Sequence, residues 1–171
     1  QPLFTPNELK LGLETAEISH RLARRSYQRG QLNLSYEVTA VFYQLVQAQE
    51  ELAIATEALA RQQENFDLAK RKFQAGLIPE VESLQMEVDL AGAHNDLLGR
   101  KSDLILAGDR FRLLVGLPMS QVLVARASLA PTIFEVDHDL ALNHALEYRT
   151  EISDLYDRVR SSEITVIQTD A

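Results

Sequence analysis

The sequence predicts an all-α protein: a long antiparallel α-helical coiled-coil hairpin, then a short extended segment and a third helix. Three observations predict this fold class. The chain of 171 residues is 46% hydrophobic but only 6% aromatic, and it is rich in leucine, alanine, glutamate, glutamine and arginine, which favours helix over sheet. Apolar residues recur every seven positions in two long runs. A Gly-Leu-Ile-Pro corner at 76–79 separates the two runs.

The first predicted helix runs from about residue 6 to 75. Thr5-Pro6-Asn7-Glu8 has the spacing of a capping box, in which the Thr5 hydroxyl accepts from the Glu8 amide and the Glu8 carboxylate returns to the Thr5 amide. Pro6 then occupies the first helical position, where its missing N–H costs nothing. Gly30 is one weak point, costing about 1 kcal/mol relative to alanine. We therefore expect no break before Gly76.

From Val38 onward, this first helix follows a strict heptad, which imposes a left-handed supercoil. One set of heptad positions is Val38, Leu45, Leu52, Leu59, Phe66 and Phe73, and the other is Val41, Ala48, Ala55, Gln62 and Ala69. The second set is mostly alanine, so a partner helix can approach closely. Upstream, a looser version of the same spacing is kept by Leu9, Leu13, Ala16, His20, Ala23 and Tyr27. The change of step between Gly30 and Val38 predicts a stutter rather than a helix end.

The return helix is predicted over about 80–115, and at 1.5 Å per residue it is about 54 Å long. Its seam is formed by Leu90, Leu97, Leu104 and Phe111 with Met86, Ala93, Ala107 and Leu114, and Arg100 interrupts it. A second apolar stripe is formed by Leu84, Val88, Ala91, Leu98 and Ile105. A two-stranded hairpin needs only one seam, so the second stripe indicates that hairpins pack side by side.

Gly116-Leu117-Pro118 is predicted to end the return helix, because glycine commonly follows a helix and proline cannot continue one. Residues 119–136 read as extended or irregular, with a candidate short strand at 122–125. A third helix is predicted from Asp137 or Asp139 to about residue 165. Its apolar positions are Leu142, Ala145, Leu146, Ile152, Leu155, Tyr156 and Val159.

The chemistry of the side chains argues against an enzyme, a cofactor or a metal site. A net charge of −8 argues against a nucleic-acid partner, which needs a basic face. The absence of cysteine excludes disulfides, thiolate zinc sites and cysteine nucleophiles. The histidines lack zinc-site spacing, and no glycine-rich phosphate loop is present. They are His20, His94, His138 and His144.

The two ends of the sequence bear on its context. No apolar run approaches the roughly 20 residues of a transmembrane helix. The start, QPLFTPNELK, has no signal-peptide pattern and resembles a cut made inside a longer chain, with a processed mature terminus as the alternative.

Acidic residues follow the corner closely and have two interpretations. Glu80 and Glu82 can simply complement the N-terminus of the return helix, as Arg71 and Lys72 complement the C-terminus of the first. Alternatively, Glu80 and Glu82 form an acidic cluster exposed at a tip, where it meets cations or a basic partner.

Several segments, in this order, resemble the TolC family of outer-membrane efflux and secretion channels. Residues 72–78 (KFQAGLI), followed by Leu-Gln-x-Glu-Val at 84–88, are similar to the family's hairpin turn. Residues 91–98 and 112–118 resemble its return helix. Residues 1–4 resemble the exit from its membrane hairpin, and residues 145–152 resemble the helix that opens its second structural repeat, which often has proline where this chain has Thr150.

The resemblance implies a domain organisation and a function. Residues 1–118 would be the long hairpin, with its tip at 75–79, and residues 119–171 an equatorial-like segment plus the helix opening the second repeat. Three chains would form a tapering α-helical tunnel in the periplasm that conducts substrates passively, as in multidrug efflux or type I secretion. The tip would dock onto a periplasmic adaptor and, through it, connect to an inner-membrane pump. The docking residues implied are Ala75, Gly76, Leu77, Ile78 and Pro79.

Two other classes of protein also contain long helical hairpins or heptad repeats. A periplasmic adaptor also carries a long helical hairpin, but its hairpin is flanked by small β-rich halves that nothing in this sequence resembles. A generic coiled-coil scaffold would explain the heptads, but neither the order of motifs nor the extended segment after Pro118. The resemblance places the protein in the outer membrane of a Gram-negative bacterium, with this part in the periplasm.

Overall fold

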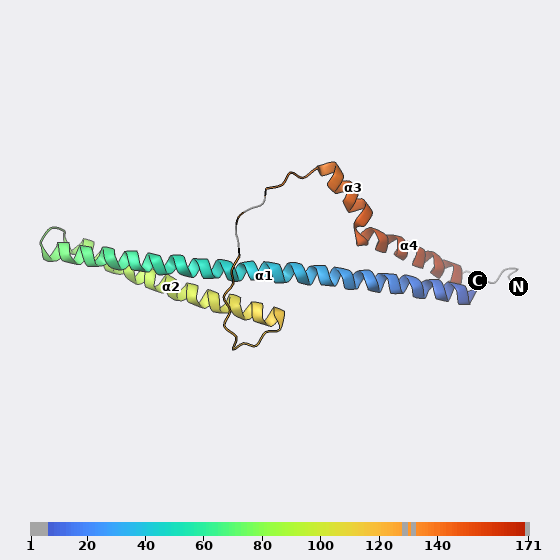
Figure 1. The fold of residues 1–171 in the computed structure, drawn as a ribbon, viewed down its shortest axis with the longest axis horizontal. Coiled ribbons are helices and arrows are strands. Elements are labelled where there is room, and N and C mark those ends of the chain that lie inside the picture. The colour runs from blue at the N-terminus through green and yellow to red at the C-terminus, as the bar shows by residue number, and fades with distance from the viewer. Residues whose placement is uncertain (1–6, 128–129, 131–132, 170–171) are drawn as a thin grey trace. The chain divides into compact units, whose positions relative to one another are not determined.

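A computed structural model describes residues 7–127, 130 and 133–169. It contains the helices α1 (Glu8–Gln74), α2 (Glu80–Val115), α3 (His138–Tyr148) and α4 (Thr150–Thr169) (Figure 1). No strand occurs among these residues, so the all-α prediction is confirmed. The contacts divide the chain into two compact units, one of residues 35–129 and one of residues 1–34 with 130–171. Each unit is described by itself.

Helix α1 is 67 residues long and continues through Gly30 without a break, as predicted. It begins at Glu8 rather than residue 6, and the side chain of Asn7 accepts from the amide of Lys10 at 3.1 Å. Asn7 therefore acts as the cap, as asparagine commonly does at this position. Thr5 and Pro6, on which the predicted capping box depended, lie outside the described residues.

In the first unit, α2 runs back antiparallel to α1 and the predicted heptad seam is confirmed (Figure 1). Leu45, Ala48, Ala55 and Ala69 are buried on α1 and Leu97 on α2. Every other seam position is half-buried except Phe73 near the corner. The polar interruption at Arg100 is a bond between the two helices, since its guanidinium lies 3.0 Å from the carboxylate of Glu51. The seam therefore holds the two helices together over most of the length of α2.

The second apolar stripe of α2 lies on the surface of the hairpin. Leu84, Val88, Leu98 and Ile105 are each at least half exposed. Ala91 is exposed as well. The described part of the hairpin therefore offers an apolar face in addition to its internal seam.

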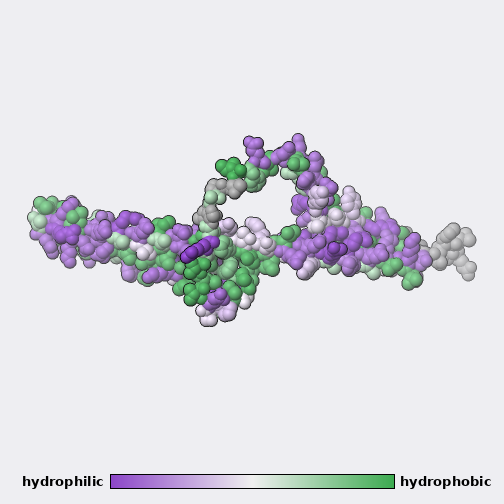
Figure 2. Space-filling view, in the orientation of Figure 1, coloured by the Kyte–Doolittle hydropathy of each residue, from purple (hydrophilic) through white to green (hydrophobic). Residues whose placement is uncertain are grey.

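Residues 117–127, which contain a turn at 119–121, cross the open end of the hairpin. The side-chain amide of Gln49 donates to the carbonyl of Ala125 at 2.8 Å and accepts from its N–H at 3.0 Å. Arg112 donates from Nε to the carbonyl of Gln121 at 2.9 Å. Figure 2 shows hydrophobic residues gathered over this end of the hairpin. The exposed ones include Leu113, Met119, Val122 and Val124.

The candidate strand at 122–125 was a wrong prediction. Residues 122–127 carry no strand pairing, although they are extended. The reason is that a side chain, that of Gln49, occupies both hydrogen-bonding groups of Ala125 that a neighbouring strand would use. An apolar tetrapeptide predicts extended backbone, but it does not show whether a second strand is present to pair with.

In the second unit, the third helix is split rather than continuous. Arg149 adopts ψ 117° between α3 and α4, and its N–H still bonds to the carbonyl of Ala145. Asp137 caps α3 by accepting from Leu140 N. The split turns α4 onto α1, where Ile164 packs with Leu11, Ile18 and Leu22.

The upstream face of α1 also differs from the expectation. The looser row of Leu9, Leu13, Ala16, His20, Ala23 and Tyr27 is exposed. The face that contacts α4 instead contains Leu11, Ile18 and Leu22 together with charged side chains. The apolar row chosen from the sequence was the wrong one, since Leu11, Ile18 and Leu22 follow a similar spacing on the face that also carries the arginines.

Candidate functional site

The corner between α1 and α2 is a left-handed helix end at Gly76. Gly76 has a φ of +68°. The Leu77 N–H bonds to the carbonyl of Lys72 at 2.9 Å and the Gly76 N–H to that of Phe73 at 2.9 Å. This pair of bonds is the Schellman motif, which satisfies the last carbonyls of a helix and turns the chain away from its axis. The tip therefore has a defined backbone conformation.

The side chains of the corner are uncharged and differ in exposure. Leu77 is 74% exposed, so it does not pack across the turn. Ala75 and Gly76 are exposed and Ile78 is half-buried. The structure therefore brings the predicted tip residues together as a small apolar end, with Leu77 projecting into solvent.

Pro79 takes the N-cap position of α2 rather than its first helical position, with φ −71° and ψ 155°. It has no side-chain hydrogen bond to offer, but its carbonyl accepts from Glu82 N at 3.1 Å. Glu80 and Glu82 lie in the first turn of α2, and Arg71 and Lys72 lie in the last turn of α1. Each charge thus complements the dipole of its own helix.

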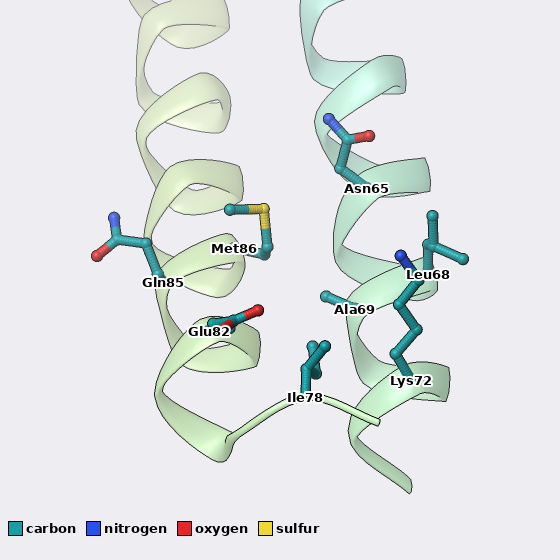
Figure 3. Close-up of a pocket in the computed structure, with 8 residues that line it drawn as sticks. All are labelled: Asn65, Leu68, Ala69, Lys72, Ile78, Glu82, Gln85 and Met86. Atoms are coloured by element: carbon teal, nitrogen blue, oxygen red, sulfur yellow. The ribbon is translucent and has the colours of Figure 1, made fainter. Parts of the chain in front are cut away.

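A pocket of about 310 Å³ lies between the two helices directly behind the corner. Figure 3 shows Ile78 on the connecting loop, Ala69 on α1, and Glu82 and Met86 on α2 directed into the gap, whereas Gln85 points away from it. The remaining lining residues are Asn65, Leu68 and Lys72. The surface of the pocket is more apolar than polar, and Asn65, Lys72, Glu82 and Gln85 supply its polar groups, a combination that suits a short apolar side chain from a partner.

Sequence reasoning missed this pocket, although it had placed several of its residues. Ala69 and Met86 had been assigned to the seam and Ile78 to the tip. Asn65 and Leu68 had no assigned role, and Gln85 belonged only to the segment that resembles the family's hairpin turn. Counting one and two turns back from Gly76 and forward from Pro79 would have found most of the lining, because those positions face each other in any tight αα-hairpin.

The histidines and acidic residues were also considered as metal ligands, and the helices as membrane spans. Among the described residues, no group of three or more histidine or acidic side chains could hold a metal ion. His144 packs edge-on against Tyr148, with ring centroids 5.7 Å apart. No helix in the described part of the chain is both long and apolar enough to cross a membrane.

The comparison with known families decides the protein's class. Residues 1–117 match the family described as outer membrane efflux protein. The chain belongs to this family. No curated protein and no solved structure gives a significant match. The resemblance to the TolC family is therefore confirmed over the hairpin, which includes the corner at Gly76.

Family membership gives the general role of the protein. Outer membrane efflux proteins are transport proteins that form trimeric channels, and they are not an enzyme family. The hairpin described above belongs to such an efflux protein of the outer membrane.

The left-handed conformation at Gly76 leads to a testable prediction. Replacing Gly76 by alanine should lower the free energy of unfolding by about 1 kcal/mol, because a side chain makes positive φ unfavourable. No atom lies within 4 Å of the added Cβ, so the backbone alone accounts for the loss. Gly99→Ala, inside α2 and equally uncrowded, should instead raise this energy by about 1 kcal/mol. Urea unfolding followed by circular dichroism measures both, and equal shifts in one direction would contradict the assignment.

Proposed function

We propose that this chain is a periplasmic wall segment of a trimeric outer-membrane efflux or secretion channel, and that its tip docks onto a periplasmic adaptor. The supporting observation is the exposed apolar corner. Leu77 is 74% exposed there, although the two helices of the hairpin already pack against each other along their seam. Leu77 adjoins Ala75, Ile78 and Pro79, and an exposed apolar patch made of neighbouring residues is a candidate contact surface. The adaptor in turn links the channel to an inner-membrane pump.

The pocket behind the corner supports the same reading. A partner helix that contacts Leu77 would place its own side chains beside the opening lined by Ile78 and Met86. Glu80 and Glu82 flank this surface and offer carboxylates to basic side chains of the adaptor. The docking set is therefore residues 75–79, with the two glutamates as an acidic border.

The exposed stripe of α2 supports lateral packing in the assembled tunnel. Leu84, Val88, Leu98 and Ile105 face solvent although the hairpin has its own seam. In a ring of hairpins this stripe would lie against a neighbouring hairpin. Residues 119–171 would then form the equatorial segment and the helix that opens the second repeat, and the substrate would pass down the centre without any chemical change.

A titration tests the docking tip directly. The purified chain should bind periplasmic adaptor hairpins from the same organism weakly, and Leu77→Asp and Gly76→Arg should each remove this binding. The first places a charge on the projecting apolar side chain, and the second places a long charged side chain on a residue that needs positive φ. Calorimetry measures affinity, and circular dichroism shows whether helix content is unchanged.

The control for this experiment is Ile54→Asp. Ile54 is 63% exposed on α1 away from the corner, so this variant makes the same change of chemistry outside the proposed docking set. Binding that survives Leu77→Asp and Gly76→Arg would mean that the corner is only a helix turn. A wild-type chain that fails to bind even when immobilised densely, where avidity favours detection, would also overturn the proposal.

A further inference from the structure

Helix α4 turns a charged face toward α1 and an apolar face toward solvent. The residues facing α1 include Asp154, Asp157, Arg160 and Ile164, spaced three or four apart on one side of the helix. On its outer side, Leu155, Tyr156 and Val159 are each more than half exposed. This is the reverse of an ordinary amphipathic helix, which buries its apolar stripe. The contact with α1 must therefore be held chiefly by charge.

Three arginines of α1 hold two aspartates of α4. Arg25 lies at the centre, and its side chain is only 16% exposed. Its Nε donates to Asp154 at 2.6 Å and its Nη2 to Asp157. Arg29 reaches Asp154 at 2.7 Å and Arg21 reaches Asp157 at 2.6 Å. Each aspartate is thus held by two guanidinium groups.

A second pair extends this row toward the other end of α4. Arg160 donates from Nε and Nη2 to the two carboxylate oxygens of Glu14, at 2.6 and 3.1 Å. Beyond it, Ile164 packs with Leu11, Ile18 and Leu22. Ile164 is the one apolar side chain of α4 that is buried, and burying it contributes about 1.5–3 kcal/mol. That is little for a 20-residue helix, since helices in proteins gain most of their stability from packing an apolar face.

The spacing of the arginines fixes one register. Arg21, Arg25 and Arg29 are one turn apart, and the aspartates alternate between them. Sliding α4 by one turn toward the start of α1 would bring Asp157 beside Glu17. Sliding it the other way would bring Asp154 beside Asn33 and leave Arg21 without an aspartate. Both shifts lose ion pairs, so the charges determine where α4 rests.

We propose that ion pairs hold α4 on α1 as a detachable arm. Its register on α1 is set by the charged row of Glu14, Arg21, Arg25 and Arg29 with Asp154, Asp157 and Arg160. When these charges are screened or removed, the arm detaches and the hairpin stays folded. This inference concerns the chain's own conformation and does not depend on adaptor docking. The arm connects through Arg149 to α3, in which no residue is buried. Besides the ion pairs, release breaks the hydrogen bond from Arg29 to the Thr150 hydroxyl and the packing of Ile164.

Salt rather than acid is the practical means of release. Hydrogen bonds from Arg21 and Arg25 lower the pKa of Asp157 to about 2. Because that folded-state pKa lies below the usual value, the contribution of Asp157 is present above about pH 4 and is lost only as the pH falls toward 2. At neutral pH, salt can weaken the ion pairs instead. Raising the salt concentration from about 0.05 M to about 1 M shortens the Debye length to about 3 Å, which screens the attraction between the charges.

The test is hydrogen exchange followed by mass spectrometry. The variant Asp154→Asn/Asp157→Asn keeps the size of both side chains and removes their charge. We expect amide protection in residues 152–167 to fall at least tenfold, while residues 45–69 and 97–111 in the hairpin keep theirs. About 1 M sodium chloride should cause a smaller loss in the same residues of the wild-type chain, because partly buried ion pairs are screened less than exposed ones. Unchanged protection in α4, or an equal loss in the hairpin, would overturn the proposal.

Two further variants separate charge from size and from net charge. Glu14→Arg should loosen α4, and Glu14→Arg/Arg160→Glu should restore much of its protection, because the exchanged pair can form again. A purely steric role would not be rescued. Glu50→Gln/Glu64→Gln makes the same change in net charge as the asparagine variant on exposed hairpin residues, and it should leave α4 unaffected. Loosening of α4 by this control would contradict a specific latch.

Discussion

Replacing Leu45 by alanine should lower the free energy of unfolding of the hairpin by about 2–5 kcal/mol, the range observed when a buried leucine is truncated. Leu45 is 2% exposed and is the most deeply buried side chain of the seam. Many other buried seam positions on α1 are alanines, including Ala48, Ala55 and Ala69, which contribute little apolar area each. The loss at Leu45 should therefore fall at the upper part of that range.

The matched control for Leu45→Ala is Leu98→Ala. Leu98 lies on α2 and is 50% exposed in the outer stripe, so its truncation should cost under about 1 kcal/mol. Urea unfolding followed by circular dichroism at 222 nm compares the two variants, provided that their unfolding free energies depend on urea concentration with the same slope. Similar losses for both would mean that the outer stripe, and not the seam, carries the stability of the isolated hairpin.

The heptad made the hairpin predictable from the sequence. The bounds of α2 agree with the predicted range of 80–115, because a proline before the helix and a glycine after it end it in the same places as the apolar pattern. The ends of α1 differ from the predicted ones by one or two residues, and Asn7 caps its first turn. When the apolar repeat and the residues that end a helix agree, few other positions are possible for the ends of that helix.

The second unit was less predictable because its main contact is ionic. Hydrophobic spacing pointed to Leu13 and Tyr27 on α1 and to Leu155 on α4, and all three are exposed. The contact instead uses Arg25 with Asp154 and their neighbours. Leu11, Ile18 and Leu22 share this face at steps of seven and four, and the arginines at steps of four beside them could have distinguished it from the exposed apolar row.

The candidate site was predictable in its backbone and not in its surface. Gly76 at the end of a helical run indicates a positive φ, and the structure has it. Whether Leu77 packs across the turn or projects from it depends on the path of the loop, which the sequence leaves open. Its 74% exposure answers that question, but its role in docking stays a prediction.

The close approach of the two helices gives the second large effect. Ala55 is 4% exposed at a seam position where the heptad predicts a small residue. Replacing it by phenylalanine should lower the free energy of unfolding by about 1–3 kcal/mol or more, because a well-packed seam has no space for a ring and the helices must separate. The same separation would change the distance between α1 and α2 toward the corner.

Spin labels measure that separation, and an exposed alanine provides the control. The chain has no cysteine, so labels at Glu64→Cys and Glu87→Cys, both on exposed positions, report one distance between the helices. Ala55→Phe should lengthen and broaden it, whereas Ala53→Phe, on an exposed position of the same turn, should not. If the distance stays unchanged in Ala55→Phe, small residues are not what sets the helix spacing. If it lengthens, the alanines of the seam hold the two helices at the spacing that brings the corner residues together.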